Sequence, residues 1–177
     1  ATTISAGRLT FSTAGSATTD VAVDGGATNG VLVAAPDGQW VNTGSLTNAN
    51  GSVVDVDYGG TVPGMTTAPI KVNHFSVGAG LTLKVRGLGF SAGQNYPLVT
   101  WTGIGPTDTN AFANVVLPAS PAVTGHLTLS GTTLYLHVDA VAAKSWAAGD
   151  GDWDTTTSNW LDADSNLAST YTDLADA

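Results

Sequence analysis

The chain has 177 residues and a formal net charge of −9, and only 11% of its residues are charged. Its acids are fourteen Asp with no Glu, and its Lys and Arg total five, too few to displace phosphate counterions, which excludes nucleic-acid partners. Cysteine is absent, which excludes disulfides and cysteine-ligated metals, and no apolar run approaches the roughly twenty residues of a membrane-spanning helix, so we expect no membrane insertion of this segment.

Strand-forming and turn-forming residues dominate the chain and predict an all-β fold. In chain order, the predicted strands include residues 21–23, 31–33, 54–58, 70–72, 81–86 and 134–139. Alternation places Leu81, Leu83 and Val85 on one face, and it turns Asp55 and Asp57 outward. Glycine-containing turn signals separate the strands, and we expect almost no helix, with any short piece near residues 142–146 or 162–168.

A Gly-x-Leu-Thr or Gly-Leu-Thr pattern recurs along the chain and suggests a repeat. It places leucines at Leu9, Leu46, Leu81 and Leu127. Two of the spacings between these leucines are similar and one is longer, which fits either successive coils with an insertion or an accident of a Thr-rich and Gly-rich composition.

Three blocks of the second half resemble the autotransporter-associated β-strand repeat proteins, large secreted or surface-exposed bacterial chains. The first block, residues 90–103, contains Tyr96-Pro97-Leu98, and the second is residues 117–138. The third, residues 145–160, runs from Ser145-Trp146 to Asn159-Trp160 and is similar to the element that opens a next unit of that family.

The resemblance implies a right-handed parallel β-helix, or β-solenoid, in which residues 1–177 form one all-β segment of a longer repetitive chain. A next repeat unit would then begin near residues 145–177. Stacking of coils would enclose the apolar stripes, so most ladders should be parallel. The alternative fold is an antiparallel β-sandwich built of hairpins.

Asp150, Asp152 and Asp154 occupy positions 1, 3 and 5 of a loop, as oxygen ligands do in calcium loops, so calcium is the one cofactor that the sequence suggests. The loop lacks the glycine and the glutamate of an EF-hand, and turn residues that hydrogen-bond their own backbone are the alternative interpretation. Neither the pairs of Asp residues nor the Ser and His residues form a recognisable catalytic motif. We therefore predict no enzyme activity.

Histidines 126 and 137 would face each other if residues 130–133 closed an antiparallel hairpin that pairs Leu129 with Leu134. In a solenoid the two strands would instead follow one another around the coil, and this pairing would vanish. His74 is assigned no role.

Tryptophan is the remaining ligand-binding candidate, because sugar rings stack on exposed aromatic faces. The candidate residues are Trp101, Trp146, Trp153 and Trp160, with packing under turns as the alternative. The leading functional hypothesis is a non-catalytic structural or surface-display segment of a secreted or cell-surface bacterial protein, whose partners are other coils of its own chain. The alternatives are a module that binds polysaccharide through its Trp-bearing loops, and a self-assembling extracellular filament or matrix subunit made of copies of the chain.

Overall fold

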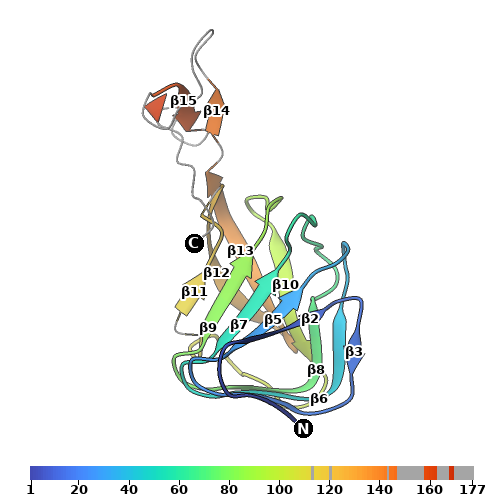
Figure 1. Ribbon diagram of the computed structural model, residues 1–177. Helices are drawn as coiled ribbons and strands as arrows, with labels where there is room; N and C mark the ends of the chain where they lie inside the picture. Colours follow the sequence, from blue (N-terminus) through green and yellow to red (C-terminus); the bar gives the residue numbers. More distant parts are fainter. Residues whose placement is uncertain (113, 120, 143, 147–157, 163–167, 170–177) are drawn as a thin grey trace.

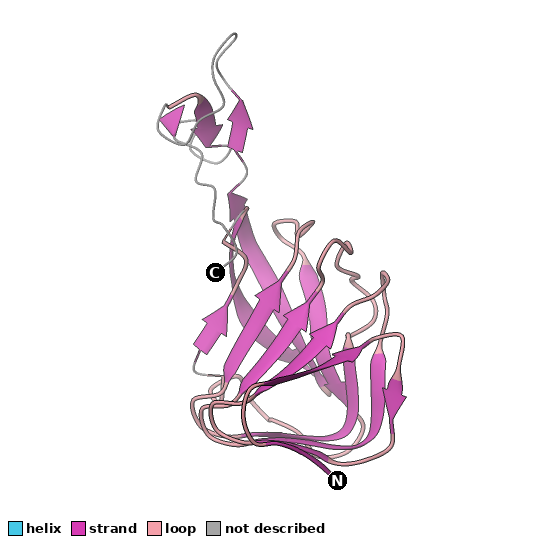
Figure 2. Cartoon of the chain, in the orientation of Figure 1, coloured by secondary structure: helices cyan, strands magenta, loops and turns pink. Residues whose placement is uncertain are grey.

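The protein is built of strands that the chain adds alternately to two sheets. Its structure, a computed structural model, describes residues 1–177 apart from 113, 120, 143, 147–157, 163–167 and 170–177. Strands and loops make up the described residues, and no helix occurs among them (Figure 2). No helix long and apolar enough to span a bilayer is therefore found in this part of the chain.

The larger sheet contains eight strands. Their order is β1 (Thr2–Ile4), β4 (Val21–Val23), β6 (Trp40–Asn48), β8 (Ile70–Val77), β10 (Asn95–Trp101), β13 (Thr133–Ala142) and β12 (Ala122–Ser130), with β3 (Ser16–Ala17) also beside β6. The second sheet has the order β11 (Asn114–Val116), β9 (Thr82–Arg86), β7 (Val53–Asp57), β5 (Thr28–Leu32) and β2 (Arg8–Ser12). Figure 1 shows both sheets.

Most strand pairs of the two larger sheets are parallel, as the sequence predicted. From β4 to β11 successive strands alternate between the two larger sheets, so the parallel partner of a strand comes from an earlier or later passage of the chain through the same sheet. Parallel neighbours require such long connections, because a tight turn can only join antiparallel strands. This pattern does not fit the alternative of an antiparallel sandwich made of hairpins.

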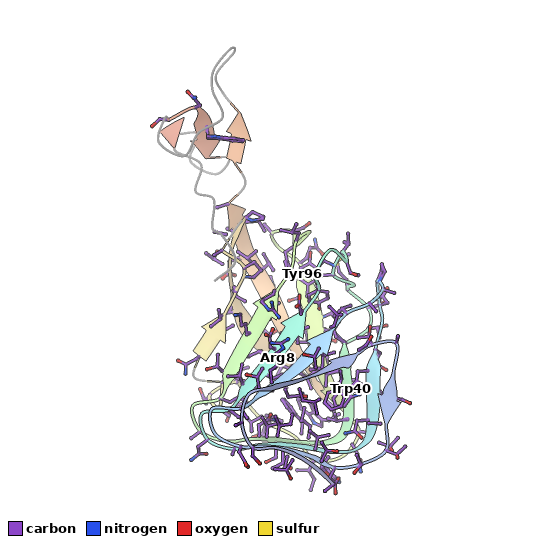
Figure 3. All side chains as sticks on the ribbon, in the orientation of Figure 1. Arg8, Trp40 and Tyr96 are labelled. Carbon is purple, nitrogen blue, oxygen red and sulfur yellow. The ribbon has the colours of Figure 1, made fainter. Side chains whose placement is uncertain are left out.

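Apolar side chains form rows that run across the strands of each sheet. In the five-stranded sheet Phe11, Val31, Val56 and Val85 lie in register on successive strands, and the three valines are fully buried. In the larger sheet, side chains around Trp40 fill the space between the sheets (Figure 3), and Phe11 stacks on the Trp40 ring with centroids 4.4 Å apart. Each strand therefore buries its inward residues against those of the neighbouring passes.

Three turns that lead into the five-stranded sheet lie one above another. They are closed by hydrogen bonds from the N–H groups of Ala27, Ser52 and Leu81 to the carbonyl groups three residues earlier. The third position of each turn is a glycine with positive φ, namely Gly26, Gly51 and Gly80. Two bonds join the stack, from Gly26 N–H to Gly51 O and from Gly51 N–H to Ala79 O, both 3.1 Å. The turns at Gly26, Gly51 and Gly80 thus repeat at the same end of β5, β7 and β9.

The Leu-Thr pattern does not mark equivalent positions in this arrangement. Leu9 lies in β2, Leu46 lies in β6 of the other sheet, and Leu81 closes a turn. The observed register instead relates Val21 to Leu46 and Leu46 to Phe75. The interpretation of the pattern as a series of stacked coils was therefore wrong, because a short composition match carries no information on strand pairing.

The parallel series of the larger sheet ends in an antiparallel hairpin. Strands β12 and β13 pair Leu129 with Leu134 and His126 with His137, and β13 also pairs antiparallel with β10. The expectation that these two strands follow one another around a coil was wrong. Gly131, at φ 57°, begins a two-residue turn that returns the chain directly beside itself.

A third, three-stranded sheet contains β14 (Lys144–Trp146), β15 (Trp160–Asp162) and β16 (Ala168–Ser169), all antiparallel. It lies beyond the end of the β12–β13 hairpin in Figure 1. Residues 142–146 were one of the two places where the sequence analysis allowed a short helix. Lys144–Trp146 is instead a strand.

Candidate functional site

Trp101 and Trp160, the predicted sugar-binding residues whose side chains the structure describes, are both buried. Trp101 is only 3% exposed and packs against Phe75, with ring centroids 5.9 Å apart. Gly105 lies so close to the indole that a β-carbon there would collide with the ring. Both features leave no free face of Trp101 for a sugar, because the protein itself covers the ring.

Two of the remaining predicted residues, Trp146 and Trp160, belong to the three-stranded sheet. Trp160 is buried and pairs in register with Trp146 across β14 and β15. Trp153 and the three predicted calcium ligands, Asp150, Asp152 and Asp154, lie outside the described residues. Within the described residues, no group of three or more His, Asp, Glu or Cys side chains is arranged to hold a metal ion.

An ion-pair cluster on the outer face of the five-stranded sheet holds one buried carboxylate. Asp55, on β7, is 3% exposed at its side chain and contacts the guanidinium groups of Arg8 on β2 and Arg86 on β9. Arg86 also lies 2.7 Å from Asp57. Asp55 points to the outer face of the sheet, as predicted. It is nevertheless buried, because Arg8 and Arg86 cover its carboxylate. The sequence could not reveal these contacts, since the three strands are far apart along the chain.

Asp20, Ser45 and His74 lie next to one another on strands of the larger sheet or just before one. The Ser45 N–H donates to Asp20 Oδ1 at 2.8 Å, and this bond, followed by one from the Ser45 side chain, holds the pKa of Asp20 below its usual value. His74 pairs in register with Ser45, but its Nδ1 accepts the Ile104 N–H at 2.8 Å. The nitrogen that could accept a proton is thus occupied, so this row cannot activate Ser45 as a nucleophile.

A shallow cleft of about 520 Å³ lies between β8 and the loop that follows β10. Its lining combines apolar and polar groups, including Ser76, Ile104 and Asp108, and Ile104 is 78% exposed. The carboxylate of Asp108 accepts the N–H of Asn110. No acid–base pair is formed by the described residues of this cleft, which gives it no evident chemistry.

The outer face of the β10–β13–β12 ladder carries a cluster of polar side chains, which we call the His pair cluster: His126, His137, Asp139 and Asn95. The imidazoles are 5.0 Å apart between centroids, and His126 Nδ1 lies 3.1 Å from Asp139 Oδ1. His137 Nδ1 lies 2.9 Å from Asn95 Oδ1, and its Nε2 lies 3.7 Å from Asp139 Oδ1.

The hairpin register, which the sequence analysis set out only as the alternative to a solenoid, brings the two histidines together, and the acid beside them was missed. A signal was available, because His137 and Asp139 are two residues apart and alternate strand residues share a face. Asn95 could not have been found in this way, since it belongs to a strand some forty residues earlier in the chain.

Comparisons of this chain with known proteins identified no similar protein. No protein-family model, no curated protein and no solved structure matches this chain.

Proposed function

We propose that the chain is a β-solenoid segment with a non-catalytic structural or surface-display role in a secreted or cell-surface bacterial protein. The right-handed winding and the link to autotransporter-associated β-strand repeat proteins belong to this proposal, and the three sequence blocks of the second half support that link. The observation that carries the proposal is the alternation of the chain between two largely parallel sheets.

The register of the strands supports a stack of coils. Val53 pairs with Thr82, and Asn48 pairs with Val77, so the same shift in residue number relates β7 to β9 and the second part of β6, after its register shift, to β8. In a solenoid each coil covers the apolar residues of its neighbour, and stability resides in these contacts between neighbours. Such a fold gives length and rigidity from repeated units, which suits a spacer or a display rod.

Deletion of one coil tests the fold. Removal of residues 49–77 joins Asn48 to Gly78, which would place β5 beside β9 and β6 beside β10 in the existing register. We expect this variant to unfold cooperatively at a lower temperature. Removal of residues 49–69 is the matched control, because it deletes β7 alone and leads the chain from β6 directly into β8 of the same sheet. Equal loss of folding in both variants would contradict the solenoid.

A separate measurement tests the structural role. Addition of glycans from a broad panel to the purified chain should leave its tryptophan fluorescence unchanged, since Trp101 and Trp160 are buried. Saturable binding to one glycan would favour the adhesive alternative instead.

Self-assembly is a second candidate, and the sheet edges favour it. Strands β1 and β2 each end the order of their sheet on one side, and Leu9 of β2 is 38% exposed. An edge of this kind offers backbone N–H and C=O groups to another strand. Light scattering and electron microscopy of the concentrated chain would detect filaments, and a monodisperse monomer at high concentration would argue against them.

A further inference from the structure

The His pair cluster is a group of polar side chains for which the proposed structural role requires no function. His126 and His137 lie directly opposite each other on adjacent strands of a hairpin, on its outer face. Their side chains are 58% and 30% exposed, so an ion from solvent can reach them. Imidazole nitrogen is a ligand that suits Zn²⁺, Ni²⁺ and Cu²⁺.

The spacing of the two rings matches that of two imidazoles on one ion. With nitrogen about 2.0–2.1 Å from a tetrahedral metal, two ligating rings have centroids about 5 Å apart, and two ligand atoms lie about 3.3 Å apart. The observed centroid separation is 5.0 Å. Asp139 Oδ1 lies 3.1 Å from His126 Nδ1 and 3.7 Å from His137 Nε2, so a negative charge lies beside both rings and favours a cation there.

Asn95 orients one of the rings for this purpose. Its Oδ1 accepts the Nδ1–H of His137 at 2.9 Å, which leaves Nε2, 3.7 Å from Asp139 Oδ1, as the ring nitrogen with a free lone pair. Metal-binding histidines commonly donate their second ring N–H to an oxygen in this way, because the bond selects the tautomer and the ring orientation.

We propose that His126 and His137 form a cross-strand clamp for a divalent transition-metal ion of the zinc, nickel and copper class. The two imidazoles are the protein ligands of this clamp and water completes the coordination, while the Asp139 carboxylate adds a negative charge beside the ion. The ion would join β12 to β13 through one imidazole from each strand. This role is independent of the structural function proposed above, since it needs only the hairpin and β10.

Calorimetry and thermal unfolding of the untagged chain with ZnCl₂ or NiCl₂ test the clamp. We expect saturable binding and a rise in the unfolding temperature, because an ion that binds only the folded state stabilises it. CaCl₂ and MgCl₂ at the same concentrations should leave the unfolding temperature unchanged, since these ions prefer oxygen ligands. The variants His126→Ala and His137→Ala should each lose the zinc effect, and Asn95→Ala should weaken binding by about 10- to 100-fold.

Two controls separate the clamp from other ligands. Asp24→Asn removes an exposed acid elsewhere on the chain and should retain the full effect. In nuclear magnetic resonance spectra, Cu²⁺ should broaden the imidazole signals of His126 and His137 before those of His74, whose Nδ1 is bonded to the Ile104 N–H.

The proposal is overturned if the wild-type chain shows no zinc or nickel effect. It is also overturned if either alanine variant, with normal circular dichroism, binds as the wild type does. The His126 variant provides a test even if the His137 variant fails to fold, since the His126 side chain is the more exposed of the two.

Discussion

The guanidinium of Arg8 lies directly over Gly30. A β-carbon at position 30 would be 2.5 Å from the nearest guanidinium nitrogen, so only glycine leaves room for the arginine there. Gly30 is on β5, between the strand of Arg8 and the strand of Asp55, and it pairs in register with Asp55. The missing side chain thus allows Arg8 to reach across one strand and cover the buried carboxylate of the next.

A double-mutant cycle should detect this dependence. Gly30→Ala alone should lower the free energy of unfolding by about 1–2 kcal/mol, because the methyl group displaces Arg8 from Asp55. In an Arg8→Ala background the same substitution should be neutral or stabilising by about 0.5–1 kcal/mol, since alanine restricts the unfolded chain more than glycine does. Urea denaturation of the four proteins measures the coupling, and additive effects would show that the two residues are independent.

Asn29 should be replaceable by an apolar residue with a gain in stability. It is fully buried, and neither its Oδ1 nor its Nδ2 has a hydrogen-bond partner among the described residues. Its register neighbours are Leu9 and Val54. Asn29→Leu keeps the number of side-chain heavy atoms and should raise the free energy of unfolding by about 1–2 kcal/mol.

Asn48→Leu is the matched control for Asn29→Leu. Asn48 is equally buried, but its Nδ2 donates to the Ser76 carbonyl at 3.0 Å. This substitution should therefore destabilise the protein relative to Asn29→Leu, because it removes a hydrogen bond to the Ser76 carbonyl. If both leucine variants were destabilised to the same extent, the amide of Asn29 would have to be satisfied in solution.

Tyr58 should limit stability at alkaline pH. Its hydroxyl is buried without a partner among the described residues, and burial raises the pKa of Tyr58 well above its ordinary value. The unfolded chain ionises Tyr58 near pH 10, so its contribution to stability is complete below that pH and is lost as pH rises toward the folded pKa.

Tyr58→Phe should flatten the alkaline limb of a plot of unfolding free energy against pH, and at neutral pH it should be neutral or slightly stabilising. Tyr96→Phe is the control, because the Tyr96 hydroxyl accepts the Ser91 N–H at 2.8 Å. That variant should lose about 1 kcal/mol at neutral pH. An unchanged alkaline limb in Tyr58→Phe would contradict the assignment.

The stacked turns should be sensitive to glycine replacement. Gly51 has a φ of 71°, where an L-residue with a β-carbon is disfavoured, so Gly51→Ala should lower the free energy of unfolding by about 1–2 kcal/mol. Gly60 is also in a turn, but it lacks a positive φ and has open space around it. Gly60→Ala should change the unfolding midpoint little, and equal effects at both positions would show that the backbone conformation is not the cause.

Local periodicity was sufficient to predict which side chains face inward. The alternation in residues 81–86 and 134–139 indicated that Leu83, Val85, Leu134 and Leu136 are buried, and all four are. This succeeds because a strand turns successive side chains to opposite faces, whatever its partner is. The turn signals at Gly26, Gly51, Gly59 and Gly131 succeeded because a positive φ is a property of a single residue, whereas Asn29-Gly30, which also has the composition of a turn, lies within β5.

The sequence by itself determined an all-β chain, its inward faces and many of its turns. Only the tertiary structure decided which strands are neighbours, and with that the contact of Arg8 with Asp55, the burial of Trp101 and the place of Asn95 beside His137. Each of these depends on the register between segments separated by tens of residues. That register is set by the packing of whole strands against one another, and no short pattern within one strand contains it.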